Sequence, residues 1–384
     1  MAGLLLGLLL APAWAAAADW PAFKGDAARS GLAPALEPPV HEAWRVHLKG
    51  SLYSSPAVSQ GRVLLGSSAK RLYCLDLKDG AMLWAADLPD HVWGSSPAVA
   101  DGQAFVGCVD GCVHALALAD GHEVRRWCGQ PHGFFGGGDE VYSAPLVAAG
   151  KLVFGSDDQA IYGVDLQGAA AWHVETDGII HDNGACACGS TAYIPSRDGK
   201  LYALALADGA QRWAFSAPKP FNTVPLCDGG TVWAGDGDSR LYCLDAATGA
   251  VRWSFLAGKR GLMSSPALGA DGTLVFGSTD GSVYGLDGAT GQQRWRHKTG
   301  DMVLASPLIT GAVAWIGSFD GSFRALRLAD GHELWRSHLD GGIFTSAAAS
   351  GDRVLVAGRD GDLACFQATP PPAADAAIPP APMP

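Results

Sequence analysis

The sequence is poor in charge, and the charge that it carries is mostly negative. Charged residues fill only 17% of its 384 positions, whereas glycine occurs 51 times. This composition favours many short strands joined by tight turns over long amphipathic helices. The formal net charge of −11 leaves no basic excess. Nucleic acid and anionic membrane surfaces are therefore not expected as partners, because both bind basic patches.

Long apolar runs are absent except at the N-terminus. Residues 4–10 form a short apolar core, and the small residues Ala16, Ala17 and Ala18 precede Asp19 as at a signal-peptidase site. We predict that residues 1–18 are a signal peptide and that the protein is periplasmic or secreted. A membrane anchor is the alternative, but the apolar part is too short to span a bilayer. No cysteine directly follows the cleavage site, so a lipid anchor is not expected. No other long apolar run predicts a membrane span after signal removal.

A repeat of about forty residues organises the rest of the chain. Tryptophan returns at intervals of 40 to 45 residues, at Trp44, Trp84, Trp127, Trp172, Trp213, Trp253, Trp295 and Trp335. In six of the seven complete units a glycine stands four residues before the tryptophan, and only Gly121 and Trp127 break this spacing. Most units also carry a Ser-Pro strand, a β-branched run and a turn such as Asp280-Gly281, which is a strong hairpin signal.

Four antiparallel strands in each repeat are typical of a β-propeller blade. The glycine-rich segments are then turns and not phosphate-binding loops, because no helix follows them. An eighth unit, residues 345–367, lacks its last strand, while the first strand around Trp44 lacks a blade. We therefore predict an all-β, eight-bladed propeller of four-stranded antiparallel blades over residues 41–368, closed by the N-terminal strand. Residues 19–40 are a lead-in segment, and residues 369–384 are a disordered Pro/Ala-rich tail.

The repeat also carries a family resemblance. The spacing Gly285-x-Asp287-x₃-Gly291-x₃-Trp295 resembles the tryptophan-docking repeat of the PQQ-repeat (quinoprotein-like) β-propeller family. That family includes dehydrogenases that bind pyrroloquinoline quinone (PQQ) and the B lipoprotein of the outer-membrane β-barrel assembly machinery, which lacks the cofactor. Residues 19–31 resemble the lead-in of secreted PQQ-repeat propellers. The resemblance implies that the tryptophans dock between neighbouring blades, and it concerns fold more than function, because the repeat is structural.

In the loops that lead into several successive blades, polar residues stand at or beside the usual Ser-Ser-Pro motif. They are Glu140, His181, Asp182, Asn183, Asn222 and Arg260. These loops should lie on one face near the axis, where the resemblance places quinone and calcium in the dehydrogenases. Candidate Ca²⁺ ligands are Glu140, Asp182 and Asn183, and candidate catalytic bases are Asp182 and His181. Candidate cofactor contacts are Glu140, Asn183, Asn222 and Arg260. The alternative is a solvated polar rim without a ligand.

Nine cysteines in an exported protein leave at least one unpaired. Several occupy small buried slots that other blades fill with alanine or glycine, and free thiols fit there: Cys74, Cys243 and Cys365. Cys108 and Cys112 flank the turn at Val109-Asp110-Gly111 on opposing strands, so a disulfide between them is the candidate pairing. Cys128, which follows Trp127 at the start of the inserted loop, is the best candidate for a reactive thiol, although structural burial is the favoured interpretation. Cys186 and Cys188 point to opposite faces of a strand, and no partner is predicted for them.

Three functions stay open on the sequence alone. The first, which we favour, is a monomeric, non-catalytic scaffold that binds a protein partner in the cell envelope through loops on one face, without a cofactor. The second is a PQQ- and Ca²⁺-dependent oxidoreductase or a PQQ-binding sensor. The third is a polysaccharide-binding propeller with Trp93, Phe134 and Phe135 as stacking platforms. The scaffold is favoured because residues 129–141 are the only obvious elaboration of the bare repeat.

Overall fold

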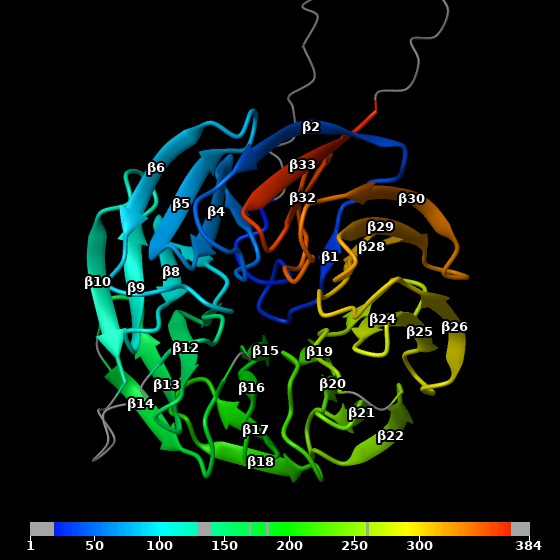
Figure 1. Ribbon diagram of the computed structural model, residues 1–384. Helices are drawn as coiled ribbons and strands as arrows, with labels where there is room; N and C mark the ends of the chain where they lie inside the picture. The colour runs from blue at the N-terminus through cyan, green and yellow to red at the C-terminus, as the bar shows by residue number, and fades with distance from the viewer. Residues whose placement is uncertain (1–18, 130–139, 169, 182–183, 259–260, 370–384) are drawn as a thin grey trace, which may run out of the picture.

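The computed structural model is a ring of eight β-sheets around a common axis (Figure 1). It describes residues 19–129, 140–168, 170–181, 184–258 and 261–369. The sheets follow one another around the ring in sequence order, from blue to red in Figure 1. These eight sheets confirm the predicted all-β, eight-bladed propeller. Within the described ranges, no helix has the length and hydropathy needed to cross a membrane.

Each blade runs from the axis outwards through consecutive strands. Blade 1 contains β3 (Ala57–Ser59), β4 (Arg62–Ser67), β5 (Arg71–Asp76) and β6 (Met82–Asp87). Blade 2 contains β7 (Ala98–Ala100), β8 (Gln103–Gly107), β9 (Cys112–Ala117) and β10 (Glu123–Cys128). Blade 3 contains β11 (Leu146–Ala148), β12 (Lys151–Ser156), β13 (Ala160–Asp165) and β14 (Ala170–Glu175). Blade 4 contains β15 (Cys186–Cys188), β16 (Thr191–Pro195), β17 (Lys200–Ala205) and β18 (Gln211–Ser216).

The second half of the ring repeats this plan. Blade 5 contains β19 (Leu226–Asp228), β20 (Thr231–Gly235), β21 (Arg240–Asp245) and β22 (Val251–Leu256). Blade 6 contains β23 (Ala267–Leu268), β24 (Thr273–Ser278), β25 (Ser282–Asp287) and β26 (Gln293–Lys298). Blade 7 contains β27 (Leu308–Thr310), β28 (Val313–Gly317), β29 (Ser322–Arg327) and β30 (Glu333–His338). Blade 8 contains β31 (Ala348–Ser350), β32 (Arg353–Ala357), β33 (Asp362–Ala368) and β2 (Val40–His47).

Blade 8 closes the ring with strands from the two ends of the propeller. Strand β2 pairs antiparallel with β33, from Val40 opposite Ala368 to His47 opposite Asp362, and the two lie side by side at the top of Figure 1. This confirms that the N-terminal strand completes the last blade. Closure pairs two strand edges that would otherwise be free to pair with other chains.

The burial of each strand depends on its distance from the axis. In blade 1, β4 and β5 bury four or five consecutive residues, whereas β6 alternates between exposed and half-buried positions. Strands packed on both faces read as continuous apolar runs, and an outer strand with one face in solvent alternates. This difference explains why the sequence repeat combines an apolar centre with a polar outer strand.

Six of the repeated tryptophans dock on the next blade. The Trp295 indole Nε1 donates to the carbonyl of Leu328 at 2.7 Å, and its ring covers Gly331, whose φ is +70°. A Cβ at Gly331 would lie 2.5 Å from the ring, so the turn glycine is required both by the backbone and by the indole. The same donor bond is made by Trp44, Trp84, Trp172, Trp213 and Trp253.

Trp127 does not dock in this way. Arg125, and not Trp127, stands opposite Ala115, which is the register that the tryptophan holds opposite Ala203 and Ala325 in other blades. Arg125 also lies against the glycine of the next blade, Gly168. The outer strand keeps the usual register, but the tryptophan lies two residues further along it. Trp127 still packs against the apolar cluster that blades 2 and 3 share, but within the described part of the chain it does not make the Nε1 bond of the other six. At the closure, Trp335 packs edge-on against Phe366 with 5.1 Å between ring centroids.

Two disulfides form, and neither is the candidate pairing. Cys112 is bonded to Cys128, directly opposite on the neighbouring strand, and Cys108 is a buried thiol. The candidate Cys108–Cys112 disulfide is therefore wrong, and Cys128 is not a free reactive thiol. Cys188 is bonded to Cys227, which joins the innermost strands of blades 4 and 5.

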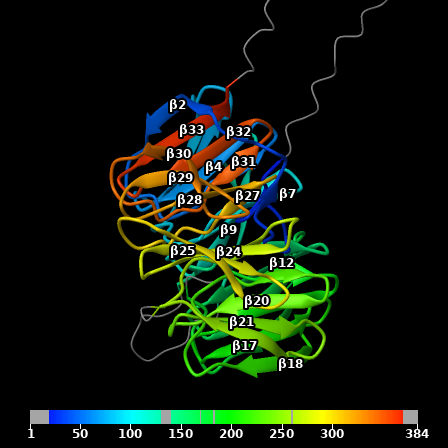
Figure 2. The same cartoon turned by 90° about the vertical axis from the view of Figure 1, so that its right-hand side faces the viewer.

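The lead-in segment passes through the middle of the ring. Trp20 forms a bridge with Val58 in blade 1, and β1 (Leu32–Ala33) adds a parallel fifth strand to β27 of blade 7. Between these points the lead-in carbonyls accept hydrogen bonds from innermost-strand amides of Val99, Ala187, Cys227 and Ile309. Figure 2 shows the blue segment beside β27 and β31. The sequence pattern gives the lead-in no position, and in the structure it lies against the innermost strands at the axis of the propeller.

Candidate functional site

One side chain from each blade forms a ring around the axis on one face of the propeller. It comes from the loop that leads into the innermost strand, and in every blade it follows directly on a buried residue while being itself at least partly exposed. We call this ring the channel rim. Its members, in blade order, are Tyr53, Trp93, Tyr142, His181, Asn222, Met263, Leu304 and Phe344.

At one or both of two positions between the rim residue and the innermost strand, most blades carry serine or threonine, whose hydroxyls hold these loops in place. The first ties the loop to its own blade, as where the Gly66 amide donates to Ser54 Oγ at 3.2 Å. The second links one blade to the next, as where the Ser55 amide donates to Ser96 Oγ at 3.0 Å. This second set, the serine belt, comprises Ser55, Ser96, Ser265, Ser306 and Ser346. The recurring Ser-Ser-Pro motif thus supplies the hydrogen bonds that fix the rim loops.

The serine belt is interrupted at blades 3, 4 and 5, where Ala144, Gly184 and Val224 replace serine. Within this gap, Arg29 of the lead-in reaches blades 3 and 4. Its Nη2 donates to the carbonyl of Pro145 and its Nε to that of Ala185, each at 2.9 Å. Arg29 is fully buried, and burial lowers its pKa to about 10. The lead-in therefore supplies the link between blades that the loops there lack.

The rim is apolar over six successive blades. Its apolar arc runs from blade 6 to blade 3 and comprises Met263, Leu304, Phe344, Tyr53, Trp93 and Tyr142. Tyr53 stacks on Trp93 with 4.1 Å between ring centroids and meets the edge of Phe344 at 5.4 Å. Trp93 is 42% exposed. A contiguous cluster of partly exposed aromatic side chains marks an interaction site more often than scattered single ones do.

The remaining rim positions, on blades 4 and 5, are polar. His181 Nδ1 lies 2.7 Å from Asp157 Oδ2, and its ring packs against Tyr142 at 4.3 Å. Asp157 belongs to the turn between β12 and β13, and sequence analysis missed it. The only signal was a second aspartate in a turn that usually holds one. The pair fixes the imidazole orientation, which a base requires.

The other predicted site residues fall into two groups. Asn222 is on the rim, and among the described residues its buried Oδ1 has no hydrogen-bond partner. Glu140 precedes blade 3, where its carbonyl accepts the Asp157 amide at 3.0 Å. Three candidates lie outside the described residues, namely Asp182, Asn183 and Arg260. The structure thus brings Glu140 near the His181–Asp157 pair but forms no described cluster of Ca²⁺ ligands from them.

A small axial cavity lies beneath the rim. It is lined by rim residues including Tyr53, Asn222 and Phe344, by the serine belt, and by Phe23 of the lead-in. About 60 Å³ of it is open to water, whereas pockets for small organic ligands measure about 300–1,000 Å³. Lys24, next to Phe23, donates to the carbonyls of Ser265 and Pro266, and burial lowers its pKa to about 7. The lead-in therefore closes the axis below the rim.

A family model described as "Outer membrane protein assembly factor BamB" matches residues 31–130 and 157–302, more than half of the chain. The chain belongs to this BamB-like PQQ-repeat family. The match spans blades on both sides of the residues 131–156 that it omits, so the family assignment rests on the repeat itself.

Two curated relatives are also assembly factors BamB. The chain is 38% identical over 80 residues to the protein from Moranella endobia (strain PCIT) and 37% identical over 83 residues to that from Yersinia pestis. Each alignment covers 21% of the relative, so the chain matches only about a fifth of the length of these BamB proteins.

Two solved structures share the fold over most of the chain. BamB from Moraxella catarrhalis superposes with a TM-score of 0.72 at 18% identity, covering 86% of this chain and 98% of that one. Quinohemoprotein alcohol dehydrogenase from Comamonas testosteroni gives 0.78 at 14% identity, covering 91% and 80% respectively. A BamB fold and a quinoprotein fold are equally good matches, so the decision between them depends on the site.

Proposed function

We propose that this protein is a non-catalytic scaffold of the cell envelope that binds a protein partner at the channel rim. The observation that carries the proposal is the apolar arc. Six neighbouring blades place an apolar or aromatic side chain at one equivalent position, on a fold that keeps such side chains mostly inside. Stacked aromatic side chains such as Tyr53 and Trp93 give a large contact area at low entropic cost.

The proposed partner is a polypeptide with exposed apolar side chains. The chain carries a net charge of −11, so an acidic partner is disfavoured by repulsion. The relatives are named for outer membrane protein assembly, and we extend that process and its cell-envelope location to this chain. A segment lying across the rim would meet the apolar arc on one side and the His181–Asp157 pair on the other.

PQQ is not part of this proposal. What supports leaving the quinone out is that Phe23 of the lead-in lines the axial cavity and that only about 60 Å³ of it is open to water. Calorimetric titration of PQQ with Ca²⁺ into the full chain should therefore give no saturable heat. Saturable binding near one equivalent would revive the oxidoreductase hypothesis and lead to dye-linked assays of an Asp182→Ala variant.

The scaffold hypothesis is tested by complementation. Deleting the gene is expected to lower the amount of folded β-barrel protein in the outer membrane, measured by heat-modifiable migration on gels. The wild-type chain should restore it, and the double variant Trp93→Ala/Phe344→Ala should restore little, because it removes the exposed centre of the apolar arc.

The matched control is Val251→Ala/Leu256→Ala, which removes two exposed apolar side chains from outer strand β22. This variant should complement like the wild type at equal protein level. Full activity of the rim variant, or equal loss in both variants, would contradict a docking role for the rim. Soluble glycans that quench the fluorescence of Trp93 would instead favour the polysaccharide hypothesis, whose other residues, Phe134 and Phe135, lie outside the described residues.

A further inference from the structure

The eight blades provide an internal comparison at the turn between the second and third strands. Three positions recur there, and three blades hold serine, aspartate and tyrosine at them: Ser156, Asp158 and Tyr162; Ser196, Asp198 and Tyr202; Ser278, Asp280 and Tyr284. Blade 2 alone holds Cys108, Asp110 and His114 at these positions. Both replacements exchange a hydroxyl for a better metal ligand, and the shared aspartate is already one.

The hydroxyl residues have a structural task that blade 2 also fulfils. In blade 6, Tyr284 donates to Asp280 Oδ2 at 2.7 Å, and the Asp280 amide donates to Ser278 Oγ at 3.2 Å. In blade 2, His114 Nε2 lies 3.0 Å from Asp110 Oδ2. Where the turn pairs an aspartate with a side chain four residues later, tyrosine serves that purpose in the sister blades, and neither a thiol nor an imidazole is required. Folding alone does not account for the cysteine and the histidine occurring together.

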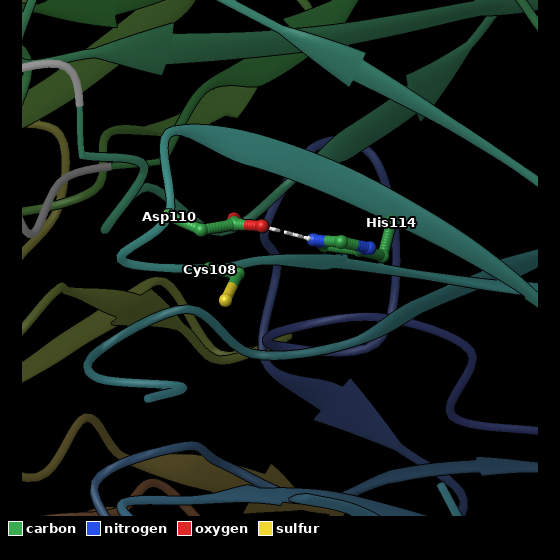
Figure 3. Close-up of side chains that lie close together, drawn as sticks. All are labelled: Cys108, Asp110 and His114. Carbon is green, nitrogen blue, oxygen red and sulfur yellow. Dashed lines mark hydrogen bonds and ion pairs between the residues drawn. The ribbon is translucent and has the colours of Figure 1, made fainter. Parts of the chain in front are cut away.

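The three side chains converge in the folded protein. Cys108 Sγ, an Asp110 carboxylate oxygen and a His114 ring nitrogen all lie within 4.8 Å of one another. Figure 3 shows Asp110 and His114 facing one another across the turn, with Cys108 beside Asp110. Ligand atoms of tetrahedral zinc lie about 3.3–3.6 Å apart, given bonds of about 2.0–2.3 Å. Closing the cluster around an ion therefore needs movements of roughly 1 Å.

The surroundings match those of a bound cation. His114 is fully buried, and its Nδ1 lies 3.4 Å from Glu123 Oε2, the kind of carboxylate that orients a metal-binding histidine. Cys112, the nearest competing sulfur, is held in the disulfide with Cys128, which leaves Cys108 as a thiol. A thiolate, a carboxylate and a neutral imidazole together balance a divalent ion, so the complex is neutral where it is buried.

We propose that Cys108, Asp110 and His114 bind one divalent transition-metal ion, with Zn²⁺ as the best match to this N, O and S donor set. Asp110 is the partly exposed member, with a side-chain exposure of 17%, so water completes the coordination on its side. Binding releases the thiol proton to solvent. The ion would lie directly behind the rim, because the Val109 amide donates to the His91 carbonyl and the Val141 amide to that of Cys108.

The test uses the full chain with its disulfides intact and without a histidine tag. Titration with Co²⁺ should give one equivalent of a tetrahedral spectrum with a thiolate-to-cobalt charge-transfer band, which Zn²⁺ displaces. Equilibrium dialysis followed by metal analysis should find one zinc per chain. Glu123→Gln should weaken Zn²⁺ affinity by about tenfold, because it loosens the orientation of His114.

Cys108→Ser and His114→Tyr supply the decisive variants. Each introduces the residue that the sister blades hold, so both should fold, and both should lose the charge-transfer band and the stoichiometric zinc. Cys243→Ala is the control, since it removes another buried thiol at a slot that holds Ala203 in blade 4, and it should bind like the wild type. No cobalt band in the wild type, or a band that persists in Cys108→Ser or His114→Tyr, overturns the proposal.

Discussion

Trp295→Ala is expected to lower the free energy of unfolding by about 4 kcal/mol, because it empties a large buried site between two blades. Trp295 is 7% exposed, donates from Nε1 to Leu328 and covers Gly331. Its loss leaves the Leu328 carbonyl without that donor and removes the surface on which blade 7 rests. Urea unfolding followed by circular dichroism, with linear extrapolation to water, measures the change.

Trp93→Ala is the matched control for this prediction. It also replaces tryptophan by alanine, but at a side chain that is 42% exposed and stacked on Tyr53. Its expected cost is about 1 kcal/mol, the range of an aromatic contact without deep burial. Equal losses in the two variants would mean that docking between blades is not what the repeated tryptophan contributes.

Arg29→Met should cost about 3 kcal/mol. The guanidinium donates to the carbonyls of Phe23, Pro145 and Ala185, and methionine leaves these three acceptors without that donor in a buried place, at about 1–3 kcal/mol each before relaxation. Methionine retains much of the side-chain volume, so the change reports on hydrogen bonding more than on packing. The same unfolding experiment measures it.

Arg336→Met is the control on the surface. The Arg336 side chain is 52% exposed and pairs with Glu333, so its replacement should change stability by no more than about 0.5 kcal/mol. If Arg29→Met proved as harmless as Arg336→Met, the lead-in would not be the link between blades 3 and 4. Proteolysis of the lead-in provides an independent check, because Arg29→Met should speed cleavage of residues 19–36 if they detach from the axis.

The features that could be predicted from the sequence are those that every blade repeats. Trp295, Gly291 and the turn at Asp280-Gly281 recur with fixed spacing, and local turn chemistry and cross-blade packing act in the same way in each copy. Closure by β2 could also be predicted, because half a blade was missing at one end and present at the other. Because the unit repeats, the long-range arrangement of the blades follows from the number of units in the sequence.

The features that were missed depend on one blade differing from its neighbours. Blade 2 alone holds cysteine at both Cys112 and Cys128, which the usual register of β10 places opposite one another. The irregular spacing between Gly121 and Trp127 reflects only the later position of the tryptophan on that strand. His181 meets Asp157 because loops of adjacent blades lie side by side. The path of the lead-in could not be predicted, because its bonds are mostly from backbone to backbone and leave no residue pattern.

The position of the lead-in has a consequence for the order of assembly. Residues 27–36 need the innermost strands of blades 4, 5 and 7 as partners, and β2 needs β33. These partners are synthesised much later, and long-range contacts form slowly because of the entropy of closing large loops. These early parts of the propeller are therefore the last to be fixed in place. The blades must assemble as an open arc before residues 27–36 can pack between them.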